Sequence, residues 1–166
     1  MKIYIDFDGV ILDTETHLFD EYHRLKEKNK SLSSREYLEQ FNWKKHIRES
    51  AEINNAIKIL NEIKLDISIL TKICSEQEGI AKIEFLRNSN FNKPIITVPI
   101  DSKKCDIVEA KDNLLIDDTV HNLDDWTNAG GKAIYFNKDN IDIDPWNNTN
   151  TKYQKIKSLH ILYDYI

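Results

Sequence analysis

Short, continuous runs of β-branched and aromatic residues, separated by stretches with helical spacing, constrain the fold of this chain more than any other feature. Runs that stay apolar, instead of alternating with polar residues, are typical of strands buried on both faces of a parallel sheet. Five runs predict such strands: Ile3–Ile5, Ile67–Leu70, Ile95–Val98, Leu114–Ile116 and Ala133–Phe136. Because strands and helices alternate, we expect an α/β fold with a parallel sheet flanked by helices.

A helical insertion interrupts this alternation after the first strand. Residues 14–49 show no strand pattern, but their apolar residues recur at helical spacing. Ser33 or Ser34 is expected to cap a helix in this insertion. We therefore expect residues 1–13 and 50–166 to form one core and residues 14–49 to form a small separate unit.

Two further helices are expected outside the insertion. Apolar residues in Ala51–Lys64 recur every three or four positions, which predicts a helix over this segment. Residues 137–151 are rich in Asn and Asp and are expected to form a surface loop. The chain would then close with a helix over Lys152–Tyr165, packed on the sheet through Leu159 and Leu162.

Composition narrows the class of protein. The chain has 166 residues, which suits one domain, and a net charge of −5 with both signs mixed along it. A nucleic-acid polymer is not an expected partner, because binding its phosphates needs a clustered basic face. Met1–Asp6 reaches an acidic residue before any long apolar run, so we expect neither a signal peptide nor a membrane span. Cys74 and Cys105 are far apart, which suggests free thiols and a cytoplasmic protein.

Acidic and hydroxyl side chains follow the predicted strands. Asp6 and Asp8 come after the first strand, Thr71 after the second, and Asp117 and Asp118 after the fourth. Open parallel sheets bind ligands beyond the carboxyl ends of their strands, so these side chains should meet at one edge. Carboxylates brought together repel one another unless a cation is present, and oxygen-rich sites of this kind suit Mg²⁺. We therefore expect a magnesium site.

These residues resemble the motifs of the haloacid dehalogenase (HAD) superfamily of phosphohydrolases. Asp6–Thr14 resembles the first motif, an Asp-x-Asp after an apolar strand, while Thr71 matches the second and Leu114–Asp118 the fourth. Lys104 is our choice for the lysine of the third motif, with Lys103 as its nearest competitor for the substrate phosphate. The resemblance implies a Rossmann-like core with a small helical cap inserted after the first strand.

The resemblance also implies roles for the aspartates. Asp6 would be the nucleophile that forms an aspartyl-phosphate, and Asp8 would serve as general acid and then general base. Asp118 would bind Mg²⁺ together with Asp6 and the backbone carbonyl of Asp8, and Asp117 would support the same ion. The presence of Asp8 favours phosphate ester hydrolysis, because the dehalogenase branch lacks this second aspartate.

The remaining expectations concern the substrate. Thr71 and Lys104 would hold the phosphoryl oxygens. In the family a cap closes over the site and selects the substrate, which makes Trp43 and Lys45 candidates for contacting it. We favour the alternative that Trp43 packs beneath a solvated basic helix face. The short cap and Leu114–Asp118 also look like the 5'-deoxyribonucleotidase branch, which implies a nucleoside monophosphate as substrate.

The sequence therefore predicts a Mg²⁺-dependent phosphatase that acts on a small phosphate monoester. Two alternatives stay open, namely a non-catalytic module that binds a phosphorylated ligand and a phosphomutase. A receiver-type signalling domain is disfavoured, because its acidic pair comes first in the chain, whereas Asp117 and Asp118 come late. With four glycines and no Gly-x-x-x-x-Gly-Lys-Ser/Thr, a P-loop nucleotidase is excluded.

Overall fold

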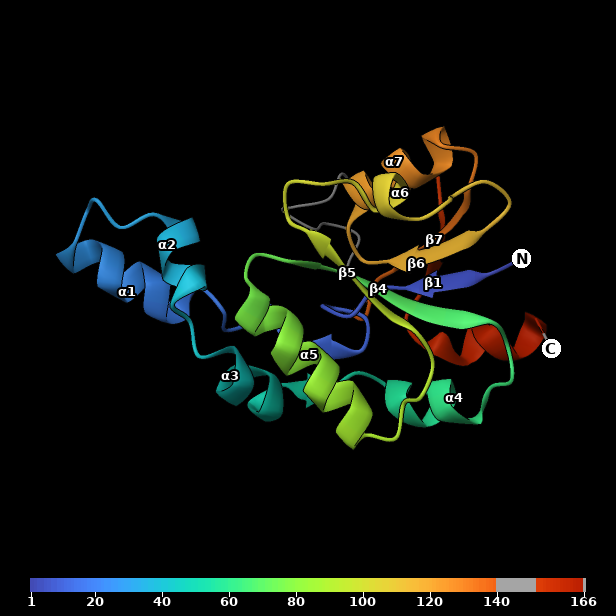
Figure 1. The fold of residues 1–166 in the computed structure, drawn as a ribbon, viewed down its shortest axis with the longest axis horizontal. Helices are drawn as coiled ribbons and strands as arrows, with labels where there is room; N and C mark the ends of the chain where they lie inside the picture. The colour runs from blue at the N-terminus through green and yellow to red at the C-terminus, as the bar shows by residue number, and fades with distance from the viewer. Residues whose placement is uncertain (140–151, 166) are drawn as a thin grey trace.

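A computed structural model describes residues 1–139 and 152–165, which form a six-stranded parallel sheet between two layers of helices (Figure 1). The strands follow the order β5-β4-β1-β6-β7-β8, and every neighbouring pair is parallel. Their bounds are β1 Ile3–Ile5, β4 Ile67–Ile73, β5 Ile95–Pro99, β6 Leu114–Asp117, β7 Lys132–Phe136 and β8 Gln154–Ile156. All five apolar runs form strands, so the predicted parallel α/β fold is confirmed.

Helices cover both faces of this sheet. One face is covered by α4 (Ala56–Glu62), α5 (Glu76–Asn88) and the 3₁₀ helix η1 (Leu159–Tyr165), and the other by α6 (Lys104–Ile107) and α7 (Val120–Asn128).

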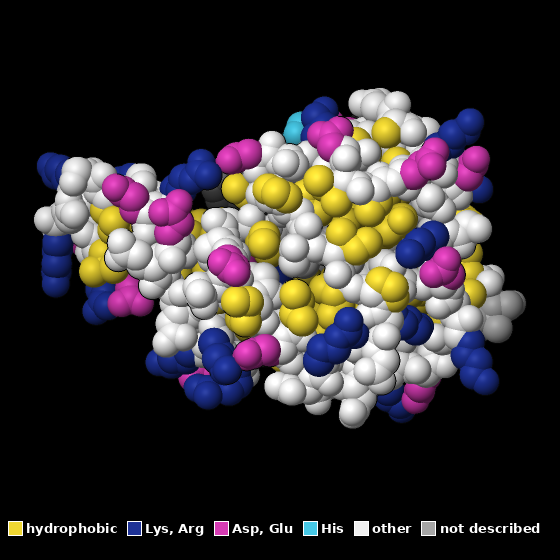
Figure 2. Space-filling view, in the orientation of Figure 1, with side chains coloured by type: hydrophobic (Ala, Val, Ile, Leu, Met, Phe, Trp, Pro, Cys, Tyr) yellow, Lys and Arg dark blue, Asp and Glu magenta, His cyan; other side chains and the backbone are white. Residues whose placement is uncertain are grey.

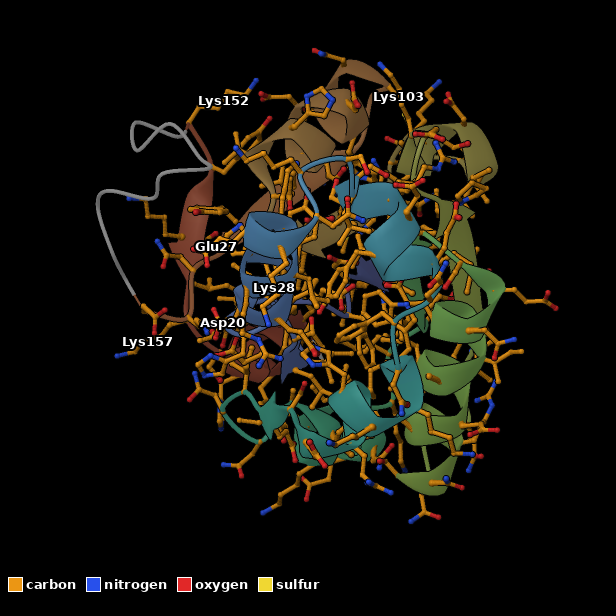
Figure 3. All side chains as sticks on the ribbon, turned by 90° about the vertical axis from the view of Figure 1, so that its left-hand side faces the viewer. Asp20, Glu27, Lys28, Lys103, Lys152 and Lys157 are labelled. Carbon is orange, nitrogen blue, oxygen red and sulfur yellow. The ribbon has the colours of Figure 1, made fainter. Side chains whose placement is uncertain are left out.

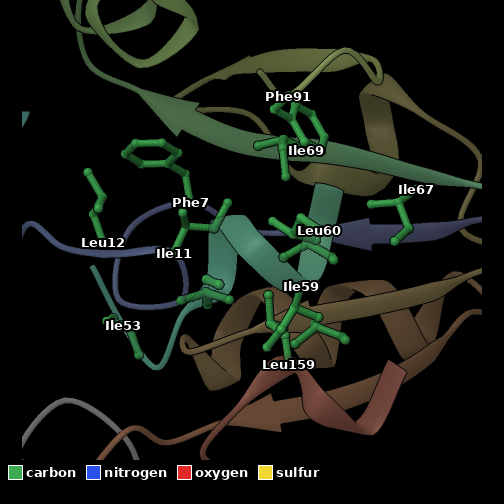
Figure 4. Close-up of a cluster of buried hydrophobic side chains, with 14 of the residues drawn as sticks. Phe7, Ile11, Leu12, Ile53, Ile59, Leu60, Ile67, Ile69, Phe91 and Leu159 are labelled. Atoms are coloured by element: carbon green, nitrogen blue, oxygen red, sulfur yellow. The ribbon is translucent and has the colours of Figure 1, made fainter. Parts of the chain in front are cut away.

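Side chains of β1 alternate between the two layers. Ile3 and Ile5 join the larger apolar cluster, part of which is drawn in Figure 4, while Tyr4 joins the cluster that contains Trp126. This is the two-residue period of a strand buried on both faces.

The insertion after β1 begins and ends in a short antiparallel ribbon. Strand β2 (Leu12–Asp13) pairs with β3 (Ala51–Glu52), and between them lie α1 (Asp20–Lys28), α2 (Ser34–Glu39) and α3 (Trp43–Glu49). Of the two serines expected to cap a helix, Ser33 forms a capping box with Glu36 at the start of α2.

The three helices of the insertion do not sit together on the core. The pair α1 and α2 projects from the body as a separate lobe, which carries charges of both signs (Figures 1 and 2). Helix α3 instead packs beside α5, where Lys44 forms an ion pair with Glu84 at 2.8 Å. The lobe of α1 and α2 is therefore the part of the insertion that overhangs the sheet edge.

Two predicted helices have different boundaries in the structure. The helix expected over Ala51–Lys64 begins only at Ala56, because residues 51–52 pair with β2 and Asn54 and Asn55 have positive φ angles of 47° and 58°. The closing helix expected over Lys152–Tyr165 is wrong in its first half, where β8 extends the sheet beside β7 and only η1 is helical.

Two further expectations concern the loop and the membrane. Residues 140–151 of the expected surface loop lie outside the described part of the chain. Of the helices in the described ranges, none has the length and apolarity needed to cross a bilayer.

Candidate active site

Strands β1 and β6 end at the same edge of the sheet and bring aspartates there. Ile5 is the register partner of Ile116, and the N–H of Asp6 donates to the carbonyl of Ile116 at 2.9 Å. Asp6 and Asp117 therefore lie at the carboxyl ends of neighbouring strands, where parallel sheets bind ligands. On the other side of β1, Thr71 lies inside β4 and not after it, because this strand extends beyond its predicted end.

The turn after β1 folds tightly against Asp118. Gly9 has a φ of +66°, which residues with a side chain adopt at a cost. A Cβ atom at Gly9 would lie 1.9 Å from Oδ2 of Asp118. Glycine is therefore required both by the turn and by the close approach of the Asp118 carboxylate.

Lys104 and three aspartates form a compact group, which we call the Lys104 cluster (Lys104, Asp6, Asp117 and Asp118). Lys104 is only 2% exposed, and its Nζ lies 2.7 Å from Oδ1 of Asp6 and 2.6 Å from Oδ2 of Asp117. One oxygen from each aspartate lies within 4.8 Å of the others. The structure thus brings together one of the two candidate lysines with three of the four predicted acidic residues.

Lys103, the competing lysine, lies elsewhere. Its side chain is 55% exposed, at the periphery of the molecule, and forms an ion pair with Asp125 at 2.7 Å (Figure 3). The chain begins α6 at Lys104, which turns consecutive lysines in different directions. Lys104 is therefore the lysine that contacts Asp6.

Asp117 is surrounded by protein donors. Besides Lys104, it accepts hydrogen bonds from the backbone N–H of Thr119 at 2.8 Å and from Nδ2 of Asn122 at 3.2 and 3.1 Å. These contacts occupy both of its oxygens. Asp117 consequently anchors Lys104 inside the site.

Burial and mutual repulsion govern the protonation of the Lys104 cluster. Burial raises the pKa of Asp6 to about 7, with the charge of Lys104 opposing the shift and Asp117 and Asp8 adding to it. Burial, followed by the charges of Asp117 and Asp6, also raises the pKa of Asp118 well above its usual value. Burial by itself would lower the pKa of Lys104, but Asp117 and Asp6 outweigh it and raise that pKa.

The donor set of the Lys104 cluster fits a hard divalent cation. Carboxylate oxygens are the ligands that Mg²⁺ prefers, and two or three of them at this spacing can share one ion. The carboxylate of Asp8 is not part of this group. The side chain of Asp8 is therefore used differently, and the role that the resemblance implies for Asp8 at the ion concerns its backbone carbonyl alone.

The side chain of Asp8 belongs to a second group, the Lys82 cluster (Lys82, Asp8, Glu78 and Thr71). Lys82 is 0% exposed, and its Nζ lies 2.5 Å from Oδ2 of Asp8 and 2.6 Å from Oε1 of Glu78. It also donates to Oγ1 of Thr71 at 3.1 Å. Thr71, expected to hold a phosphoryl oxygen, is fully buried and directs its hydroxyl into this cluster.

A cavity of about 350 Å³ opens above these residues, between the core and the insertion. Asp6, Asp8 and Asp118 lie on its floor, and much of its wall is apolar. The apolar side chains of the wall are Leu18, Phe19, Leu38 and Trp43 from the insertion and Ile100 from the loop after β5. Phe19 and Ile100 are both exposed. The site can thus accommodate a small molecule with an apolar body.

The two insertion residues expected to contact substrate occupy different places. Trp43 is 4% exposed and donates its Nε1 hydrogen to the carbonyl of Leu38 at 2.9 Å, so it packs beneath α3 while one part of it reaches the cavity wall. Lys45 lines a separate cavity of about 570 Å³ between α1, α2 and α3. The structure does not bring Lys45 to Asp6.

Four contributors to the site have no motif that would reveal them. Thr14, the last residue of the stretch that resembles the first motif but given no role there, donates from Oγ1 to Oδ1 of Asp8 at 2.7 Å. Asn122 follows Asp117 by five positions and can be found only once α7 is known to begin there. Glu78 and Lys82 are four residues apart on α5, which is the spacing of ordinary exposed ion pairs on helices.

Solved structures that resemble this chain identify its fold, whereas comparisons of sequence do not. No protein-family model and no curated protein matches the chain. YfnB from Bacillus subtilis, described as a HAD-hydrolase bound to magnesium, is similar with a TM-score of 0.62 and 16% identity, covering 99% of this chain and 97% of that one. A haloacid dehalogenase-like family hydrolase from Streptococcus pneumoniae gives 0.61 and 12%, covering 99% and 98%. The chain has the haloacid dehalogenase-like fold.

A third HAD-like structure, a dehalogenase, gives a TM-score of 0.59 at 13% identity and covers 99% of this chain and 96% of that one. At identities this low the likeness is one of fold. The HAD-like core and the position of its inserted helices thus agree with the fold expected from the sequence, whereas the 5'-deoxyribonucleotidase branch stays a prediction.

Proposed function

We propose that this chain is a Mg²⁺-dependent phosphatase that hydrolyses a small phosphate monoester through an aspartyl-phosphate on Asp6. The observation that carries the proposal is the Lys104 cluster, in which a buried lysine and two further aspartates surround Asp6 at the end of the central strand. A site that only bound phosphate would gain nothing from an acidic side chain at this position, because like charges repel.

Magnesium would be held by Asp6, Asp118 and the backbone carbonyl of Asp8, and when bound it would offset the negative charge of both the carboxylates and the phosphate. YfnB, which shares the fold, is described as bound to magnesium. The donor set of the Lys104 cluster supports the same ion here.

The reaction would proceed in two steps, formation of the aspartyl-phosphate and then its hydrolysis, and the chain's own residues act in both. A carboxylate oxygen of Asp6 attacks phosphorus, and the bond to the leaving oxygen breaks as that oxygen takes the proton that Asp8, protonated at the start of the cycle, carries. Asp8 then removes a proton from a water molecule, which attacks the aspartyl-phosphate and releases inorganic phosphate and free Asp6. Lys104 donates hydrogen bonds to phosphoryl oxygens throughout.

The cavity supports a substrate with a small apolar or aromatic body. Phe19 and Ile100 are exposed residues of its lining, and Leu18 and Leu38 line it as well. In a nucleoside monophosphate the phosphate would bind near Asp6, and the flat base would pack against the apolar side chains of the wall. We therefore propose nucleoside monophosphates as the first substrates to test.

The test is Mg²⁺-dependent release of phosphate from a panel of monoesters that includes nucleoside monophosphates. The wild type is compared with Asp6→Asn and with Asp164→Asn, which makes the same change at an exposed aspartate on η1. We expect release that stops with EDTA, falls by roughly 10⁴-fold or more in Asp6→Asn, and is unchanged in Asp164→Asn.

No release from any ester by a folded protein that still binds Mg²⁺ and phosphate would contradict the phosphatase and favour the ligand-binding module. Transfer of the phosphoryl group to a second position of the substrate, without release, would favour the phosphomutase.

A further inference from the structure

The buried ammonium group of Lys82 has no place in the chemistry described so far. Lys82 lies on α5 with its side chain fully buried, and its Nζ sits 5.5 Å from the centre of the Phe7 ring. Besides the contacts of the Lys82 cluster, it donates to the carbonyl of Lys72 at 2.9 Å. Burying a lysine in this way costs several kcal/mol of desolvation unless its partners compensate.

The carboxylate of Glu78 is held by the backbone as well as by Lys82. Its Oε2 accepts a hydrogen bond from the backbone N–H of Cys74 at 2.8 Å, while its Oε1 pairs with Lys82. The backbone at the end of β4 therefore holds Glu78, Glu78 holds Lys82, and Lys82 reaches Asp8. This chain of contacts connects a rigid strand to a side chain on the floor of the cavity.

Both oxygens of the Asp8 carboxylate are held. Lys82 binds Oδ2 at 2.5 Å, and the hydroxyl of Thr14 donates to Oδ1 at 2.7 Å. Held in this way, the carboxylate lies beside Thr71 and outside the group formed by Asp6, Asp117 and Asp118. A carboxylate two residues from Asp6 would otherwise be drawn to any cation bound by that group.

We propose that Lys82, anchored by Glu78, is the positioning residue that keeps the Asp8 carboxylate out of the cation site and available for proton transfer. This inference rests on the proposed function and deepens it, because it explains how one of four neighbouring aspartates is reserved for the leaving group. Lys82 does not touch the substrate and acts only through Asp8.

The test removes Lys82 and Glu78 together, so that neither is left buried without the other, and Asp8 keeps the hydroxyl of Thr14. Lys82→Met combined with Glu78→Gln keeps the volume of both side chains and an acceptor for the N–H of Cys74. The activity of this double variant is measured with phosphate esters whose leaving groups range from dinitrophenol to simple alcohols. Lys93→Met serves as the control, because Lys93 also anchors backbone carbonyls, of Leu60 and Ile63, but lies just before β5, at the end of the sheet opposite to the site.

A poor leaving group needs the proton from Asp8, whereas dinitrophenol leaves without one. We expect the rate of leaving-group release in a single turnover, which reports the first step alone, to fall roughly 10²-fold with alkyl phosphates in the double variant and less than about threefold with dinitrophenyl phosphate. Asp8→Asn should show the same pattern, and adding it to the double variant should cause little further loss, because the residues act as one unit. Lys93→Met should change stability without this dependence on the leaving group.

An equal loss with every ester, or losses that multiply when Asp8→Asn is added, would overturn the positioning role. If the wild type releases no phosphate from any ester, the proposed function fails, and crystal structures then decide the positioning role alone. In that case the Asp8 side chain should keep its conformation in the wild type and turn toward Asp118 in the double variant with Mg²⁺. An unchanged Asp8 conformation would overturn the inference.

Discussion

The Lys104 cluster and the Lys82 cluster lie at the same edge of the sheet, and in each a buried lysine bridges two carboxylates. They differ in charge. With all groups ionised, the three aspartates around Lys104 leave a net charge of −2, whereas the two carboxylates around Lys82 leave −1 and are joined by the hydroxyl of Thr71.

This difference separates two tasks within a small site. The surplus charge of the Lys104 cluster is what a divalent cation can neutralise, so the cluster is complete only with a ligand. The Lys82 cluster is satisfied by the protein itself, since Lys82 finds an oxygen partner on each side. We expect changes in the first cluster to affect cation binding and phosphate, and changes in the second to affect proton transfer.

Among the variants that compare the two clusters, Lys104→Met should produce the largest effect and should differ in kind from the loss of Lys82. We expect phosphate release to fall by roughly 10²–10³-fold with every ester, whatever its leaving group. The free energy of unfolding should fall by about 3–5 kcal/mol, because Asp6 and Asp117 lose their buried partner. Kinetics with the ester series and urea unfolding measure both. Lys103→Met is the matched variant, and a comparable loss there would mean that the wrong lysine has been assigned.

Asp118→Asn should weaken Mg²⁺ binding by at least about tenfold. The rise in melting temperature on titration with Mg²⁺ measures this affinity, and Asp164→Asn should leave it unchanged. Asp8→Asn should lower it far less than Asp118→Asn, because the Asp8 side chain is held by Lys82. An equal loss of Mg²⁺ affinity in Asp118→Asn and Asp8→Asn would contradict the assignment of cation binding to the Lys104 cluster alone.

Stability should depend on pH and on the cation together. Because the pKa of Asp6 is raised from 3.8 to about 7 in the folded protein, folding favours its protonated form. Its contribution is fully present below about pH 4 and is lost as the pH rises through 7, and the raised pKa of Asp118 acts in the same direction. In EDTA we expect a loss on the order of 2–4 kcal/mol from this source, seen as a falling melting temperature.

Magnesium should restore that loss, and its stabilising effect should grow between pH 5 and 8, since protons compete with the cation for the same oxygens. Asp6→Asn should flatten the dependence measured in EDTA. A melting temperature in EDTA that is independent of pH over this range would contradict the assigned burial of the cluster.

Thr14→Val should produce the smallest effect. It removes the hydroxyl that donates to Oδ1 of Asp8, at a buried position where valine has nearly the same shape. We expect the rate of leaving-group release in a single turnover to fall roughly three- to tenfold, with alkyl phosphates only, because Lys82 still holds the other oxygen. Thr16→Val, at an exposed position in the same segment, is the control. A loss larger than that of the Lys82→Met and Glu78→Gln variant would make Thr14 the dominant support of Asp8.

The sequence predicted those elements that are determined by residues close together in the chain. Continuous apolarity is required by burial on both faces of the sheet, so five of the six strands could be found, and with them the positions of Asp6 and Asp117. Strand β8 was missed because, unlike the other edge strand β5, it has no apolar run: Gln154 and Lys155 are polar, and the spacing of Ile156 and Leu159 mimics a helix.

Lys82 could not be found in this way. Its spacing from Glu78 is that of a surface ion pair, and only the packing of α5 against β4 buries both groups beside Asp8. The sequence also could not decide between Lys103 and Lys104, because the direction of each side chain depends on where α6 begins. Contacts made across long sequence separations leave no local pattern.

The ribbon of β2 and β3 has a consequence for how such a chain can diversify. Leu12 faces Glu52 and Asp13 faces Ala51, so the chain leaves the core and returns to it at adjacent points. The entropy of closing a loop grows only slowly with its length. Segments added or removed around α1 and α2 would therefore reshape the wall above Asp6 while every strand of the parallel sheet keeps its register. The lobe of α1 and α2 can therefore change in length and sequence while the core keeps its fold.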